Sequence, residues 1–250
     1  VEKARESFSP KQGQRLDHAE YEDSKAAITS ALTNAGYLDA NLSIHRVEVT
    51  RATDSAKIML KWDTGPRFRF GATRFRGSQF PDAFTAPYVP WDSGEYYSNE
   101  KLLELQQRLS ELNYFSLVQV LPEIDAAAND EVPVEVILAP AKRTVYTGGL
   151  FVGTDTGAGV KAGIERRWIN ERGHKLEFDT ILAQRLKTLG VLYRIPFPSR
   201  DQHSLNFGLS YRDEQTDTSE SQMIRATVND SSQWHGWTRT IGLQFLTGDF

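Results

Sequence analysis

Two periodicities of apolar residues divide the chain. Within residues 21–112, apolar side chains recur three and four positions apart in two segments, which is the spacing of one buried helix face. From Arg143 onward they recur at every second position, which is the spacing of β-strands. The pattern therefore predicts helix-containing modules in the first half and a strand-rich region in the second.

The two helical segments end in the same way. We expect helices over about 21–35 and 99–112, and Gly36 and Asn113 follow them directly. Both residue types readily adopt the left-handed conformation that ends many helices. The two segments align at a constant offset of 77 residues (113 − 36), which indicates a repeated module. The buried stripe of the second helix is expected to be Leu102, Leu105, Leu109 and Leu112.

Extended stretches complete each module. Two of them follow each helix, at 42–49 and 57–62 in the first copy and at 115–124 and 132–138 in the second. The second copy also has an opening strand, Arg67–Arg76, after the turn residues Gly65 and Pro66. The chain is therefore divided into a leader or truncated remnant (1–19), a partial module (20–64), a complete module (65–140) and a strand region (141–250).

The strand region alternates strictly between apolar and polar residues, as in Leu205, Phe207 and Leu209 against Asn206 and Gly208. We expect about seven strands, most near the ~10 residues that cross a bilayer when tilted. The expected turns are rich in Asn, Asp, Gly, Ser and Pro, at 153–157, 170–173, 198–202, 213–220 and 229–232.

Alternation alone fits either a membrane β-barrel or a soluble β-sandwich. The barrel is favoured by the length of the strands, by polar faces rich in small residues, and by aromatic residues near the strand ends (Trp168, Phe197, Tyr211 and Trp237). We retain the soluble sandwich as the alternative.

Composition and short motifs argue against an enzyme. The chain has no cysteine, which removes disulfides, thiolate zinc sites and a cysteine nucleophile. Asp155-Thr156-Gly157 matches an aspartic-protease motif, but that chemistry needs a second carboxylate, and its nearest echo is Asp217-Thr218-Ser219. A hairpin turn explains the first triplet better. The five histidines lack metal-ligand spacing: His18, His45, His174, His203 and His235. We expect no catalytic residue, metal or cofactor.

Nucleic acid is not an expected partner either. Arg67–Arg76 interleaves cations with aromatic residues, as in single-strand binders. The two faces of one strand give the same alternation, and a net charge of −4 opposes binding to phosphates.

The junction between the modules resembles that between two POTRA domains. The residues concerned are Ala35-Gly36-Tyr37-Leu38-Asp39-Ala40 and Gly65-Pro66-Arg67-Phe68-Arg69-Phe70-Gly71. Such modules running into alternating strands are similar to the outer-membrane assembly family of BamA and TamA, and the short junction resembles TamA, the translocation and assembly module. The resemblance covers residues 20–250. It implies α+β POTRA modules (β-α-α-β-β), followed by the antiparallel strands of an incomplete transmembrane β-barrel, with more strands after Phe250.

The resemblance also implies a function. The chain is expected in the outer membrane with its POTRA modules in the periplasm, as an insertase for outer-membrane proteins or autotransporters. Its partners would be unfolded client proteins, the lipid bilayer, and an inner-membrane-anchored protein such as TamB. The alternatives are a two-partner secretion exporter pore and a soluble β-rich binding module.

An insertase needs edges at which a client strand can satisfy its backbone hydrogen bonds. Two candidate edges are expected. One lies on the strand after the second helix, with Leu117, Gln119 and Leu121 on one face. The other is the first strand of the barrel, with Thr144, Val145, Thr147, Gly148 and Gly149. The glycine pair either weakens this strand so that a seam opens there, or marks a simple bend.

Overall fold

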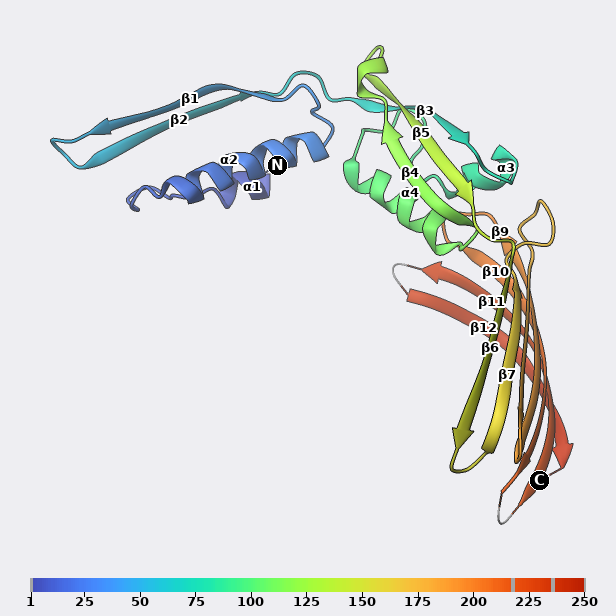
Figure 1. Ribbon diagram of the computed structural model, residues 1–250. Coiled ribbons are helices and arrows are strands. Elements are labelled where there is room, and N and C mark those ends of the chain that lie inside the picture. The colour runs from blue at the N-terminus through green and yellow to red at the C-terminus, as the bar shows by residue number, and fades with distance from the viewer. Residues whose placement is uncertain (1, 217–218, 235–236, 250) are drawn as a thin grey trace. The chain divides into compact units, whose positions relative to one another are not determined.

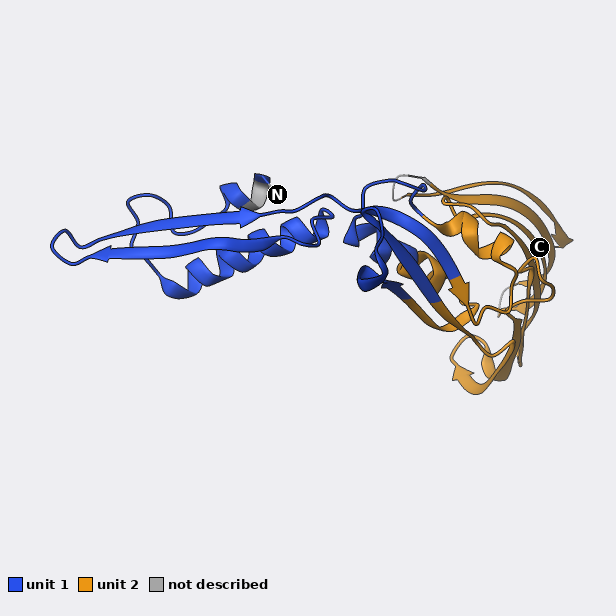
Figure 2. Cartoon of the chain, turned by 90° about the horizontal axis from the view of Figure 1, so that it is seen from above, with its two compact units in different colours: residues 1–74, 90–105, 120–136 blue, residues 75–89, 106–119, 137–250 orange. Residues whose placement is uncertain are grey.

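The computed structural model describes residues 2–216, 219–234 and 237–249 (Figure 1). The chain divides into two compact units, residues 1–74, 90–105 and 120–136 and residues 75–89, 106–119 and 137–250 (Figure 2). The division runs through the second module at 65–140, and the domain boundaries expected from sequence stay a prediction. Each unit is described by itself.

The N-terminal region contains two helices and a two-stranded sheet. Helices α1 (Glu2–Glu6) and α2 (His18–Asn34) precede the antiparallel strands β1 (Asn41–Thr50) and β2 (Ser55–Asp63). The Asp17 carboxylate accepts hydrogen bonds from two backbone N–H groups in the first turn of α2, which explains where the helix begins. Gly36 lies at φ +94° after its end. The predicted helix and hairpin of the partial module are therefore confirmed.

The segment before α2 lies against that helix. The Phe8 ring meets the Tyr21 ring edge-on at 6.3 Å, and the Ser9 N–H donates to the Ser24 hydroxyl at 2.9 Å. Residues 1–19 were expected to be a leader or a truncated remnant. Their described part contains α1 and contacts the first module.

The second module forms the expected three-stranded sheet, in the order β3-β5-β4. Its elements run β3 (Arg69–Arg76), α3 (Asp82–Thr85), the 3₁₀ turn η1 (Ala86–Tyr88), α4 (Asn99–Glu111), β4 (Phe115–Pro122), the 3₁₀ turn η2 (Ile124–Ala126) and β5 (Glu131–Pro140). Of the predicted stripe, Leu102, Leu105 and Leu109 are buried, whereas Leu112 is half-buried. Asn113 takes φ +59° after α4, as expected.

The strand region forms one antiparallel sheet of seven strands in sequence order (Figure 1). The strands are β6 (Thr144–Gly153), β7 (Gly157–Arg166), β8 (Lys175–Ala183), β9 (Leu186–Phe197), β10 (His203–Gln215), β11 (Glu220–Trp234) and β12 (Trp237–Asp249). Strands β6 and β12 are its two ends, and no pairing closes the sheet within the described residues.

One face of this sheet is apolar. Residues paired across neighbouring strands share a face. One such row contains Ile164, Phe178, Val191, Leu209, Ala226 and Phe245. The adjacent row on the other face contains Gly163, Asp179, Gly190, Ser210 and Arg225. Leu209 and Phe245 are 56% and 67% exposed, so no second layer covers them within the described chain. A sandwich would bury such residues, and the soluble alternative therefore gains no support.

The expected turn at Asn229–Ser232 is wrong, because these residues continue strand β11. The polar side chains find partners on neighbouring strands. Asn229 lies opposite Gly242, where a Cβ atom would collide with its amide oxygen. Ser231 shares a 3.1 Å hydrogen bond with Thr240. A run of turn-forming residues is thus accommodated inside a strand, and the expected turn at 213–220 shrinks because β10 extends to Gln215.

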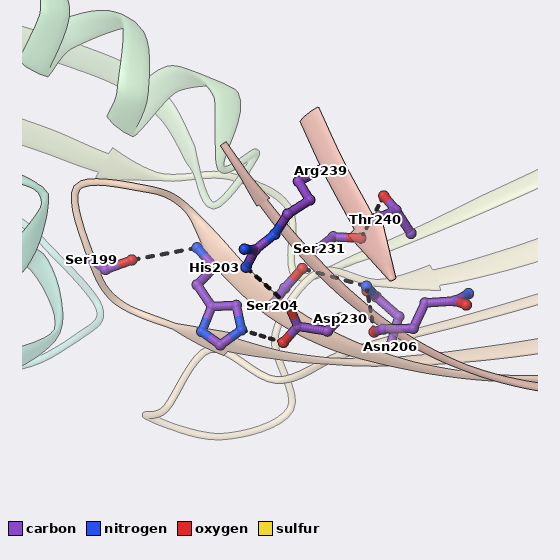
Figure 3. A network of polar contacts seen from close by, with 9 residues as sticks. Ser199, His203, Ser204, Asn206, Asp230, Ser231, Arg239 and Thr240 are labelled. Atoms are coloured by element: carbon purple, nitrogen blue, oxygen red, sulfur yellow. Dashed lines mark hydrogen bonds and ion pairs between the residues drawn. The ribbon is translucent and has the colours of Figure 1, made fainter. Parts of the chain in front are cut away.

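A cluster of polar residues lies around His203 and Asp230 on strands β10 and β11 (Figure 3). His203 Nε2 lies 2.5 Å from the Asp230 carboxylate, which also lies 3.8 Å from the Arg239 guanidinium. His203 pairs with Phe197, and Asp230 pairs with Leu205, so these groups continue the apolar rows.

Among the described helices, none is long and apolar enough to cross a membrane.

Candidate strand-pairing edges

Strand β4 is an unpaired edge of the three-stranded sheet within the described chain. Leu117 and Leu121 are each 43% exposed and Gln119 is exposed, whereas Val120 is buried. The predicted alternation therefore holds over these positions, although Phe115 at the start of the strand is buried. Apolar groups beside a row of free backbone donors and acceptors are what an added strand requires.

The opposite edge of the same sheet, on β3, is partly occupied. The Phe70 N–H donates to the Glu95 carbonyl at 2.8 Å, and the Gly94 N–H donates to the Phe70 carbonyl at 3.1 Å. The Tyr97 N–H donates to the Phe68 carbonyl at 3.0 Å. Residues 94–97 thus satisfy backbone groups of this edge, and β4 is the more available of the two.

Strand β6 is an edge of the seven-stranded sheet. It pairs with β7 in the register Thr144↔Arg166, Val145↔Glu165, Thr147↔Gly163, Gly148↔Ala162 and Gly149↔Lys161. The other side of β6 has no partner strand in the described residues. Leu150 and Val152 are each 85% exposed, so this edge combines free backbone groups with apolar side chains.

The pair Gly148 and Gly149 lies inside regular pairing, so the strand has no break there. A Cβ atom on Gly149 would lie 3.1 Å from Cε of Lys161, whereas one on Gly148 would meet only a carbonyl oxygen at 4.0 Å. Gly149 thus leaves space for the Lys161 side chain on the polar face. Nothing at this pair requires a bend.

The beginning of β6 is anchored by residues that the sequence did not single out. The Arg143 guanidinium donates to the Trp168 carbonyl at 3.0 Å and to the Ile169 carbonyl at 2.6 Å. The Arg166 guanidinium donates to the Thr144 hydroxyl at 3.1 Å. The only sequence signal was an arginine directly before a strand. These bonds fix one end of β6 to the β7–β8 turn and leave its other end held by strand pairing.

The described residues that were considered for catalysis or metal binding lie in turns and regular elements of the fold. Asp155, Thr156 and Gly157 lie at the turn between β6 and β7, where Gly157 takes φ +76°, as the hairpin interpretation predicted. His235 and the pair Asp217-Thr218 lie outside the described residues. No group of three or more potential metal ligands occurs in the described ranges. His174 contacts the Tyr193 hydroxyl at 2.7 Å, and burial together with the nearby Arg172 lowers the pKa of its imidazole.

The interleaved arginines and aromatic residues form the two faces of a short extended segment, as predicted. Phe68 and Phe70 are buried, whereas Arg67 and Arg69 are exposed. Their guanidinium groups lie 4.1 and 4.2 Å from the centre of the Tyr96 ring. Both cations therefore have an aromatic partner within the chain.

Comparison with known proteins assigns the fold. No protein-family model matches the chain. BamA from Haemophilus ducreyi lacking POTRA domains 1–3 matches with a TM-score of 0.75 and 16% identity, over 98% of this chain and 47% of that one. The fold is BamA-like. The chain spans about half the length of that BamA structure.

Two further neighbours are CdiB from Acinetobacter baumannii and the POTRA domains 3–5 of BamA from Haemophilus influenzae. The first has a TM-score of 0.49 and 11% identity over 97% of this chain and 50% of that one. The second has a TM-score of 0.42 and 21% identity over 55% of each chain. The fold is assigned by its similarity to the Haemophilus ducreyi structure.

Proposed function

We propose that this chain is part of a non-enzymatic outer-membrane assembly factor that inserts client proteins by strand pairing. One observation carries the proposal: an open antiparallel sheet with an apolar face ends in β6, an edge strand whose outer side has no partner strand in the described residues. In lipid, a client strand needs partners for its backbone groups, and an edge strand supplies them. The BamA-like fold supports the same assignment.

The chemistry of the sheet fits a membrane wall. Its apolar rows suit lipid, and its polar rows suit a wet interior. The cluster of His203, Asp230 and Arg239 ends the apolar face with polar groups, which belong at the level of lipid headgroups. We therefore propose that the seven strands lie in the outer membrane and that the α+β modules lie in the periplasm as POTRA domains.

The finer assignment follows the resemblance of the module junction. We propose a TamA-like translocation and assembly module that acts on outer-membrane proteins or autotransporters, with a TamB-like inner-membrane-anchored partner. Gly36 supports the resemblance, because a Cβ atom there would lie 2.8 Å from the Tyr97 carbonyl oxygen. The Phe68 N–H also donates to the Gly36 carbonyl at 2.8 Å. The quoted junction residues are thus in close contact.

Proline substitution in the edge strand tests the proposal. Proline lacks an N–H donor and is not tolerated inside a paired ladder, whereas valine preserves the backbone. In the full-length protein reconstituted in liposomes, we expect Thr147→Pro to abolish insertion of an outer-membrane client and Thr147→Val to retain it. Circular dichroism and resistance to proteolysis check that both variants fold.

A folded Thr147→Pro protein that inserts clients at the normal rate would remove β6 as the working edge. If Thr147→Pro fails to fold, a photo-cross-linking experiment tests the proposal instead. Photo-cross-linking residues are placed at Tyr146 on the edge strand and at Val191 on the interior strand β9. Cross-links to a stalled client from position 146 and none from 191 are expected, and equal labelling of the two contradicts pairing at the edge.

A further inference from the structure

Lys175 is the one charged residue among the buried residues of the described chain, at 7% exposure. It begins strand β8, and its Nζ donates a 2.6 Å hydrogen bond to the carbonyl of Leu112, directly after α4. The same ammonium group lies 4.4 Å from the centre of the Tyr114 ring. All three residues belong to one compact unit. The strand-pairing function described above does not use this cation.

The chemistry of the contact explains why a cation is buried here. The last carbonyl groups of a helix have no partners within the helix and carry partial negative charge. A lysine ammonium donates a hydrogen bond to such a carbonyl and interacts favourably with the negative end of the helix dipole. The aromatic face of Tyr114 supplies a second attraction. Strand β8 thereby caps the end of α4.

Gly173 provides a second link at the same place. The Tyr114 hydroxyl donates to the Gly173 carbonyl at 2.5 Å in a buried position. Gly173 takes φ +73°, and a Cβ atom there would lie 2.7 Å from the Phe84 ring and 3.0 Å from the Tyr114 hydroxyl. Any side chain at this position would therefore be strained and would force the turn away from Tyr114.

The β9–β10 turn adds weaker contacts with the module. The Arg200 guanidinium donates to the Val89 carbonyl at 3.0 Å, and the Gln202 amide donates to the Glu111 carboxylate at 2.9 Å. Both contacts are exposed, so we expect each to contribute less stability than the hydrogen bonds of Lys175 to Leu112 and of Tyr114 to Gly173. The turns on either side of β8 and β9 thus hold the end of α4 and the start of β4.

We propose that Lys175, Tyr114 and Gly173 form a joint that fixes the start of strand β4 to the base of strand β8. Strand β4 begins at Phe115, one residue after Tyr114. The joint therefore sets the position from which a client strand paired along β4 passes to the seven-stranded sheet. Lys175 is a positioning residue for this transfer. The transfer step rests on the proposed insertase function, whereas the joint itself does not.

Distance measurements in the full-length protein test the joint. Spin labels replace Gln119 on β4 and Gln184 after β8, and pulsed electron paramagnetic resonance reports the distribution of distances between them. We expect one narrow distribution in the parent protein and a second, broader population in Lys175→Met. The ratio of docked to undocked forms should fall by about tenfold, as loss of a charge-assisted hydrogen bond predicts. Lys187→Met, which removes an exposed ion pair with Asp213, should change nothing.

Client transfer is measured on the same variants by photo-cross-linking from Leu117 on β4 and from Tyr146 on β6. Lys175→Met should keep the client cross-link at 117 and reduce the cross-link at 146, an effect that a general loss of stability does not produce. Tyr114→Phe, which removes a single hydroxyl, should give a smaller change in the same direction. It also serves as the test if Lys175→Met does not fold.

Unchanged distances in both variants would overturn the joint. Broadened distances with unchanged transfer to 146 would overturn the positioning role. Absence of client cross-links from both edges in the parent protein would instead contradict the proposed function, and the distance measurement would still report on the joint.

Discussion

At the scale of single residues, the positions set by local chemistry were predictable. Gly36 and Asn113 take positive φ after their helices, and three leucines of the predicted stripe are buried in α4. Helix periodicity and left-handed residues are local signals, which explains this success. Lys175 and Arg143 were not found from sequence. Lys175 donates to a carbonyl group 63 positions away, and Arg143 donates to one 26 positions away. Every residue has a backbone carbonyl, so the sequence does not indicate which of them accepts such a bond.

The buried leucine stripe gives the prediction for this scale. Leu109→Ala should lower the free energy of opening of the second module by ~2–5 kcal/mol, because Leu109 is fully buried and truncation leaves a cavity. Hydrogen exchange at the backbone amides of β5 in the full chain measures this change. Leu103→Ala on the same helix is the control, since Leu103 is 61% exposed and should change the opening energy by less than about 0.5 kcal/mol. Equal effects of the two variants would contradict the burial of this face.

At the scale of elements, the number and order of strands were predicted better than their ends. The alternation indicated about seven strands, and the sheet has seven. The turn expected at Asn229–Ser232 failed because the sheet accommodates the polar residues of β11. Thr240 and His203 on neighbouring strands bond to Ser231 and Asp230, and Gly242 leaves room for Asn229. Turn propensity is local, whereas these contacts exist only after the sheet has formed.

The orientation of the strands is tested on β10. In the reconstituted full-length protein, spin labels at Leu205 and Phe207 should be protected from a water-soluble relaxation agent and accessible to oxygen in lipid. Labels at Asn206 and Gly208 should show the opposite pattern, because they lie on the polar face. Protection that does not alternate along these four positions would contradict a single lipid-facing side.

At the scale of the whole molecule, the resemblance of the sequence and the comparison of structures agree on a BamA-like fold that contains α+β modules and an open antiparallel sheet. The sequence predicted that the residues of the two candidate edges form strands. In the structure, Leu117–Leu121 lie in β4 and Thr144–Gly149 lie in β6. Which strands remain unpaired depends on the strand order, and alternation alone contains no information about order. The occupied edge of β3 and the anchoring of β6 by Arg143 were therefore visible only in the structure.

The central claim is that a client strand pairs with β6 in a defined register, and disulfide cross-linking measures this directly. The chain has no cysteine, so single cysteines at Tyr146, Gly148 and Leu150 introduce the only thiols of this segment. Each is combined with single cysteines along the terminal strand of a stalled client. A paired ladder predicts that a step of two residues on β6 shifts the cross-linked client position by two residues, with no cross-links from Val191 on β9. Cross-links without a register, or equally strong from Val191, would contradict insertion by strand pairing at β6.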